Sequence, residues 1–290
     1  MQYAYKPEEL ERLKKTEMEV LAAFIEICEK HDLPYFLNGG TAIGAVRHQG
    51  FIPWDDDVDV AMTRADFDKV KKHFKEEWSE GDFVFVDYNE LGKGVFLDFM
   101  TRLVYMGEEL PVNVFRKIRG KGRTDIDNHM PIDIYILDNA PDDEKKHKRL
   151  TMFIQGLYGL AMGHRAYVNY DEYKTEEEKR QKLIKRVSTI GKYIPLGLIF
   201  WMYERARRWY SKKEGKDYFE SNGWIYCIPW RFPKEWFAEG TTLPVHGHMI
   251  QAPKNYEEFL KMHYWDYMSL PPEDKRKPSH SEWASGVFQE

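Results

Sequence analysis

The sequence predicts an α/β (α+β) protein: a sheet with flanking helices, followed by a mostly helical C-terminal part. Two observations support this prediction. Before about residue 140, amphipathic helical patterns alternate with short apolar runs typical of strands. After that position, residues 142–214 carry mainly helical periodicity. We therefore place a domain boundary near residue 140, with a catalytic core at 1–140 and a second region at 141–290, and the two regions are compatible with one shared core.

The first helix is expected over residues 8–31, because apolar side chains recur there at spacings of three and four. Pro34 restricts the residue before it and ends that helix. The elements expected after it are a strand at 35–38, a helix at 41–48, a buried strand at 55–62, a helix at 64–77, a β-rich stretch at 83–137 with its clearest strand at 132–137, helices over 142–214 broken near Gly191 and Pro195, and a helix at 255–267.

The composition is that of an ordinary soluble globular protein, with 42% hydrophobic and 31% charged residues among 290. Two cysteines exclude a disulfide scaffold and a cysteine zinc site. The N-terminal residues contain no apolar signal-peptide core, and no apolar run reaches 18 residues. A cytoplasmic enzyme is the expectation.

The net charge of −5 is unevenly distributed. Residues 182–216 hold ten Lys or Arg residues and two Glu residues, which gives +8 and leaves −13 for the remainder. This basic stretch predicts an anionic partner for one face. Nucleic acid is not expected as that partner, because the acidic remainder would repel phosphates over most of the surface.

An acidic run follows a glycine-rich helix start. Gly39, Gly40 and Thr41 open the second helix, and the run Asp55-Asp56-Asp57-Val58-Asp59-Val60 follows. If the run is a strand, Asp55, Asp57 and Asp59 share one face and Asp56 points to the other. Carboxylates on one face repel each other, and they can converge on a hard cation such as Mg²⁺ or Mn²⁺.

A third carboxylate, Asp133, lies between two isoleucines in the clearest strand, where a charge needs a partner. The two glycines and the helix N-terminus could receive a phosphate. A Gly-Gly pair alone is usually just a turn, and an acidic run alone is usually a solvated surface. The combination of strand, Gly-Gly-Thr, helix and Asp-Val-Asp-Val favours a metal site.

These motifs resemble those of the LicD family, which includes bacterial phosphocholine transferases and fukutin-related ribitol-phosphate transferases. The resemblance rests on Gly39-Gly40-Thr41, Gly44-Ala45-Val46-Arg47-His48 and the run from Gly50 to Val60. It continues at Pro131–Tyr135 and at Leu270–Glu273, in a C-terminal pattern that ends at His280. The resemblance implies a nucleotidyltransferase-like fold with a mixed sheet.

The resemblance also implies roles for individual residues. Asp57 and Asp59 would ligate the metal, Asp133 would be the third carboxylate of the catalytic centre, and Asp55 would be a nearby or alternate ligand. Gly39, Gly40 and Thr41 would face the donor phosphates. Arg47 would contact a phosphate or the loop that carries Asp55, and His48 would be either a substrate contact or a structural histidine. His280 is also expected to face the substrates.

Two features of this chain bear on the resemblance. Trp265 stands where the family often has a small residue, which changes the expected shape of the C-terminal pocket. The basic strand expected before Asp133 could be Thr101–Leu103 or Arg116–Arg119. We favour the second, and so Lys117 and Arg119, because basic residues cluster there, although a solvated loop is the simpler interpretation of that cluster.

The function implied by the resemblance is transfer of a phospho-alcohol from a CDP-alcohol to a hydroxyl of a cell-surface glycan or lipid-linked glycan, as in teichoic acid or lipopolysaccharide modification, with release of CMP. Phosphocholine from CDP-choline is favoured, because aromatic rings such as that of Trp54 can hold a quaternary ammonium. Ribitol phosphate as cargo, a nucleotidyltransferase that releases pyrophosphate, and a non-catalytic scaffold remain alternatives.

An apolar run at residues 193–203 lies inside the basic stretch. A short apolar face with Trp and Phe beside many Lys and Arg is typical of a helix at a membrane surface. The alternative is a core helix with solvated basic ends. The first interpretation predicts peripheral contact with an anionic membrane, at the inner face of the cell membrane.

Overall fold

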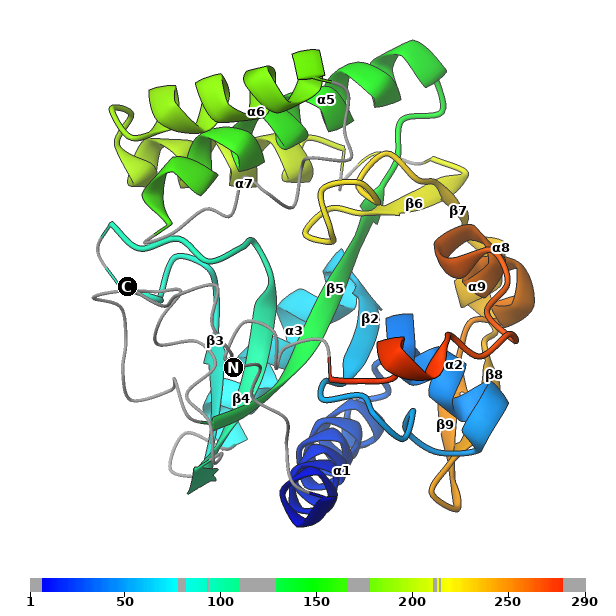
Figure 1. Cartoon of the computed structure of the whole chain (residues 1–290). Coiled ribbons are helices and arrows are strands. Elements are labelled where there is room, and N and C mark those ends of the chain that lie inside the picture. Colours follow the sequence, from blue (N-terminus) through cyan, green and yellow to red (C-terminus); the bar gives the residue numbers. More distant parts are fainter. Residues whose placement is uncertain are drawn as a thin grey trace.

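A computed structural model of the chain describes residues 7–77, 82–92, 94–109, 129–165, 178–210, 213 and 215–278. It confirms the α+β class: a curled mixed sheet carries helices, and a separate layer of helices lies beyond one end of the sheet (Figure 1).

The sheet is built around one long strand, β5 (His129–Asn139), which passes through the middle of the molecule (Figure 1). Strand β2 (Asp59–Thr63) pairs with it in parallel, and the other neighbours of β5 are antiparallel. The order is β1-β2-β5-β4-β3, and β6 pairs with the far end of β5 and with β7. The remaining strands are β1 (Phe36–Leu37), β3 (Phe83–Val86), β4 (Thr101–Glu109), β6 (Asp217–Glu220) and β7 (Phe232–Pro233).

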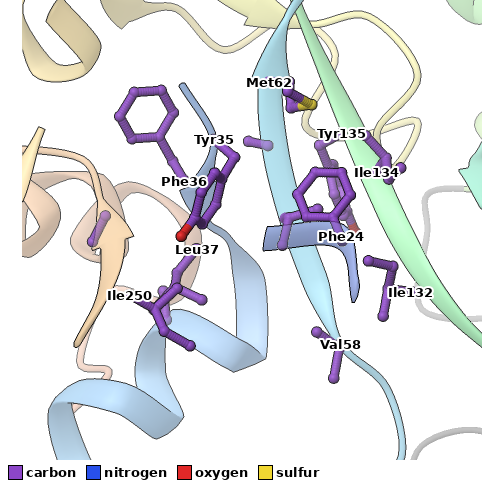
Figure 2. Close-up of a cluster of buried hydrophobic side chains, with 14 of the residues drawn as sticks. Phe24, Tyr35, Phe36, Leu37, Val58, Met62, Ile132, Ile134, Tyr135 and Ile250 are labelled. Carbon is purple, nitrogen blue, oxygen red and sulfur yellow. The ribbon is translucent and has the colours of Figure 1, made fainter. Parts of the chain in front are cut away.

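Helices α1 (Pro7–Lys30) and α3 (Arg64–Glu77) pack against the sheet. Their apolar stripes join the strands in a core that includes Phe24, Tyr35 and Ile134 (Figure 2). The same core contains Ile250 and Phe259 from the C-terminal part. Residues on both sides of position 140 therefore contribute to one hydrophobic cluster.

The helical layer consists of α5 (Glu144–Ala161), α6 (Glu178–Gly191) and α7 (Leu196–Arg208), with α5 packed against the other two (Figure 1). The predicted breaks are confirmed, because α6 ends at Gly191 and α7 begins after Pro195; residues 166–177 of the predicted helical region lie outside the described residues. Asp143 caps α5 by accepting a hydrogen bond from the Lys146 amide. No helix in the described ranges is both long and apolar enough to cross a membrane.

The C-terminal part contains strands that the sequence did not predict. Its elements are α8 (Glu235–Ala238), the hairpin of β8 (Thr241–Val245) and β9 (His248–Ala252), and α9 (Tyr256–Tyr264). The hairpin turns at His246 and Gly247, both with positive φ, which is the conformation of a tight two-residue turn. Strand β8 and α9 pack against α2 (Gly39–His48) and so lie next to the glycine-rich motif.

Two boundary predictions near this motif were wrong. The predicted strand 55–62 begins only at Asp59, because residues 55–58 pass beside α2 without forming a strand. The Asp59 amide donates to the Thr41 hydroxyl at 2.8 Å, and the Asp59 carbonyl accepts from the Asn38 amide. Helix α2 begins at Gly39, two residues earlier than expected.

Candidate active site

The start of α2 lies directly against two carboxylates. Gly39 has φ of +51°, and a Cβ atom on it would lie 2.1 Å from Oδ2 of Asp59. A Cβ atom on Gly40 would lie 2.6 Å from Oδ2 of Asp55. Both distances are too short for any side chain. A side chain at Gly39 would be strained and would meet Asp59, and one at Gly40 would displace the Asp55 carboxylate. The helix N-terminus also favours negative charge there.

Three consecutive carboxylates form a compact group beside this helix start. One oxygen each from Asp55, Asp56 and Asp57 lies within 4.8 Å of the others. The prediction that Asp56 points away from Asp55 and Asp57 was wrong. It assumed strand alternation, which does not apply to a segment that is not a strand.

Asp59 and Asp133 are register partners on the parallel strands β2 and β5. The amide of Asp133 also donates to the Val58 carbonyl at 2.8 Å, which fixes this end of the two strands together. Burial raises the pKa of Asp59 well above its usual range, and the charges of Asp57, Asp133 and Asp55 add to that effect. The structure therefore brings the four predicted carboxylates into one electrostatically coupled acidic centre.

A buried arginine belongs to this centre. The Arg102 guanidinium donates to both oxygens of Asp98 at 2.8 Å, and its Nε lies 2.9 Å from Oδ1 of Asp133. Burial alone would raise the pKa of Asp98, but the charge and hydrogen bonds of Arg102 outweigh it and lower that pKa. The segment containing Arg102 was one of the two candidates for the basic strand. The favoured residues Lys117 and Arg119 lie outside the described residues, as does His280.

Glu17 is a site residue that sequence analysis missed. It is fully buried, and in the described part of the chain neither of its oxygens has a hydrogen-bond partner. Desolvation raises the pKa of Glu17 well above its usual range, and Asp57, Asp55 and Asp56 raise it further. The sequence pattern could have revealed this residue. Glu17 lies four residues from both Leu13 and Leu21, so it is a charged residue at a core-facing position of α1.

Two tyrosines, Tyr135 and Tyr264, and a second buried glutamate, Glu220, lie near the acidic centre. Burial raises the pKa values of Tyr135 and Tyr264, and for both tyrosines Asp59 and Glu220 add to the shift. Glu220 accepts a hydrogen bond from Nδ2 of Asn38 at 3.0 Å and lies 3.5 Å from Nε2 of His263. Tyr264 as a residue is 43% exposed, although its phenol is buried among these carboxylates.

Three further predicted residues form a cluster at the other end of α2. Nη1 of Arg47 donates to the Tyr267 carbonyl at 3.0 Å, and Nε of Arg47 donates to Nε2 of His48. The ring of Trp54 lies 5.9 Å from the Arg47 guanidinium and 5.7 Å from that of Arg276. Arg47 therefore ties the C-terminal segment to α2, and Trp54 is already flanked by two cations.

The predicted donor-facing residue Thr41 is buried, and its hydroxyl accepts the hydrogen bond from the Asp59 amide. This contact positions Asp59 at the start of its strand. The other residues expected at the donor phosphates, Gly39 and Gly40, lie against the acidic centre.

The donor set of the acidic centre fits a divalent cation. It consists of carboxylate oxygens, which Mg²⁺ and Mn²⁺ prefer, and the closest three come from one short segment. Burial raises the pKa values of Asp59 and Glu17, and the neighbouring carboxylates raise them further, so a cation among these groups would favour their charged forms. Asp55, Asp56 and Asp57 would hold the ion, with Asp59 and Asp133 beside it.

A mixed sheet whose neighbouring parallel strands carry these carboxylates beside a glycine-initiated helix defines a nucleotidyltransferase-type domain. Residues 32–134 match the sequence model of the family described as "LicD/FKTN/FKRP, nucleotidyltransferase domain". This match and the full-length relative described next support membership of the LicD family.

Named relatives extend this result. The chain is 28% identical over 286 residues, 92% of its length and 94% of the relative's, to the lipopolysaccharide cholinephosphotransferase LicD of Haemophilus influenzae. It is also 41% identical over 54 residues, 18% of each chain, to an uncharacterized protein of Rickettsia typhi. A third relative, an uncharacterized protein of Rickettsia prowazekii, is 46% identical over 41 residues, 14% of this chain and 15% of its own.

Proposed function

We propose that this protein transfers phosphocholine from CDP-choline to a hydroxyl of a cell-surface glycan or its lipid-linked precursor, and that CMP is released. The convergence of Asp55, Asp57, Asp59 and Asp133 at the start of α2 carries the proposal. The family and the relative named as a cholinephosphotransferase support a transferase of this class.

In the proposed reaction, the bond between the phosphocholine phosphorus and the CMP oxygen breaks, and a bond from phosphorus to the acceptor oxygen forms. A bound Mg²⁺ or Mn²⁺ would neutralise charge on the diphosphate. Asp133, oriented by Arg102, receives the acceptor hydroxyl and takes its proton. The donor diphosphate would bind beside the first turn of α2, next to the acidic segment.

The choline group would lie against Tyr264. A quaternary ammonium cannot donate a hydrogen bond, so proteins bind it with aromatic faces and nearby negative charge. Tyr264 offers both, because it is an aromatic residue with 43% of its surface exposed and its phenol lies in the field of Asp59 and Glu220. Trp54 is less suited than predicted, because two guanidinium groups already flank it.

Peripheral membrane contact would bring the enzyme to a lipid-linked acceptor. Helix α7 buries Ile199 and Tyr203 in the helical layer, which supports the core interpretation for half of the apolar run. The other half is exposed: Leu198 is 47% and Trp201 58% exposed, and Arg205 lies 5.4 Å from the Trp201 ring. This exposed face would contact anionic lipid.

Product analysis tests the proposal. With Mg²⁺, CDP-choline and a lipopolysaccharide or teichoic acid acceptor, CMP should form and choline should appear on the acceptor. CDP-ribitol in place of CDP-choline tests the cargo, and pyrophosphate release from CTP tests for a nucleotidyltransferase. Asp57→Asn and Asp59→Asn should abolish CMP formation while the proteins stay folded. If both variants kept wild-type turnover, the assignment of the acidic centre would be wrong.

A further inference from the structure

A second group of metal-ligating side chains lies away from the acidic centre, where the C-terminal ends of α1 and α3 meet. It consists of His31, directly after α1, and of His73 and Glu77 in the last part of α3. One nitrogen of each histidine and one oxygen of Glu77 lie within 4.8 Å of one another. Along α1, the end of the helix is about 20 Å from Glu17 by the helical rise of about 1.5 Å per residue, so this group is separate from the acidic centre.

The fold creates this group from two distant segments. His73 and Glu77 are four residues apart and therefore share one face of α3. His31 comes from a position 46 residues before Glu77 in the sequence. Nε2 of His31 is 2.5 Å from Oε1 of Glu77, and Nδ1 of His73 is 4.0 Å from the same oxygen. The three side chains thus surround one point.

Existing contacts hold Glu77 beside the histidines. Its carboxylate pairs with both Lys30 and His31. The two imidazole rings are stacked, with centroids 3.6 Å apart and planes 9° apart. The side chains are 22%, 27% and 24% exposed, so an ion can reach them from solvent.

We propose that His31, His73 and Glu77 form a transition-metal site, with Zn²⁺ as the occupant, that links the end of α1 to the end of α3. Imidazole nitrogen and carboxylate oxygen are ordinary Zn²⁺ ligands at about 2.0–2.2 Å, whereas Mg²⁺ prefers oxygen alone. Metal binding requires the two rings to leave their stack, because the ligand lone pairs lie in the ring planes and must converge on the ion. Water or Glu76, whose Oε2 lies 3.9 Å from Nδ1 of His73, completes a four-coordinate site.

Calorimetric titration with Zn²⁺ alone tests this site on the full chain. The protein is first treated with a chelator and then kept in a large excess of Mg²⁺, so that the acidic centre does not contribute. We expect one saturable Zn²⁺ site. His73→Asn and Glu77→Gln should each weaken binding about tenfold or more, since even changes in groups that support metal ligands cost 10–100-fold in affinity. Zn²⁺ should also raise the thermal unfolding midpoint, and both variants should lose that rise.

Lys30→Met is the matched control. Lys30 also pairs with Glu77, so this variant disrupts the ion-pair cluster but keeps all three ligands. It should bind Zn²⁺ at least as well as the wild type, because the amine no longer competes for the carboxylate. The proposal is overturned if the wild type shows no saturable Zn²⁺ binding in Mg²⁺, or if His73→Asn and Glu77→Gln bind as tightly as Lys30→Met. These variants all lie outside the acidic centre, so the outcome is independent of the transferase proposal.

Discussion

Arg102 on β4 holds Asp133 on β5 through a contact of 2.9 Å, and the same guanidinium binds Asp98 with both of its terminal nitrogens. Arg102 and Asp133 are also register partners across the two antiparallel strands. The proposed acceptor-facing carboxylate is therefore oriented by the sheet itself and by a buried cation.

Removing this cation should destabilise the fold. Arg102→Met removes the cation that Asp98 and Asp133 share. Removing one member of a buried ion pair lowers the free energy of unfolding by about 3–5 kcal/mol. Urea denaturation should show a loss of that size. The double variant Arg102→Met/Asp98→Asn should recover part of it, because one uncompensated charge is removed. A loss below about 1 kcal/mol in the single variant would contradict the geometry of this cluster.

Mg²⁺ should stabilise the protein, because it relieves repulsion among the acidic residues. At a concentration 100 times its dissociation constant, the gain should be about 2.7 kcal/mol. Asp57→Asn should raise the unfolding midpoint of the metal-free protein, since one repelling charge is lost, and should remove most of the Mg²⁺ effect. Thermal scans with a chelator and with Mg²⁺ measure both changes. A Mg²⁺ effect that is equal in both proteins would place the ion elsewhere.

Glu17→Gln should change how stability depends on pH in the metal-free protein. Glu17 has a raised pKa in the fold, so the folded state keeps a proton that the unfolded state loses above about pH 4.3. Wild-type stability should therefore fall with rising pH, by up to about 1.4 kcal/mol per pH unit from this group, until the folded pKa is reached. The glutamine variant should lack this slope. Equal slopes for both proteins in urea titrations at several pH values would refute the buried acid.

Gly39→Ala should abolish transfer and destabilise the fold. The added methyl group would meet Oδ2 of Asp59, and alanine disfavours the positive φ of Gly39. Gly156→Ala is the control, because no described atom lies within 4 Å of its Cβ position in the interior of α5. That substitution should stabilise the protein by about 0.5–1 kcal/mol and leave turnover unchanged. Full activity in Gly39→Ala would show that Asp59 can move without consequence.

Membrane contact by α7 predicts flotation of the protein with vesicles that contain anionic lipid. Trp201→Ser should reduce the bound fraction, because this exposed ring lies beside Arg205 on the apolar face. Trp224→Ser removes a similarly exposed ring, 64% against 58%, from outside the helical layer and should not affect binding. If the wild type stays unbound with anionic vesicles, this part of the proposal fails.

The sequence by itself determined the α+β class, most helices and the acidic motif. These features depend on local periodicity, on Gly and Pro, and on contiguous residues such as Asp55 to Asp59. The helix predicted at 64–77 matches α3 at both ends. The hairpin of β8 and β9 was missed, because its pairing depends on packing against β1 and α2 rather than on local pattern.

Only the tertiary structure decided which charged groups meet. Residues 55–58 are not a strand, so Asp56 joins Asp55 and Asp57, an outcome that strand alternation excludes. Arg102 pairs with Asp133 because β4 and β5 align them, and Glu17 of α1 comes close enough to Asp55, Asp56 and Asp57 for their charges to raise its pKa. Sequence spacing controls neighbours within one element, whereas contacts between elements depend on register and packing, which the sequence encodes only through the whole fold.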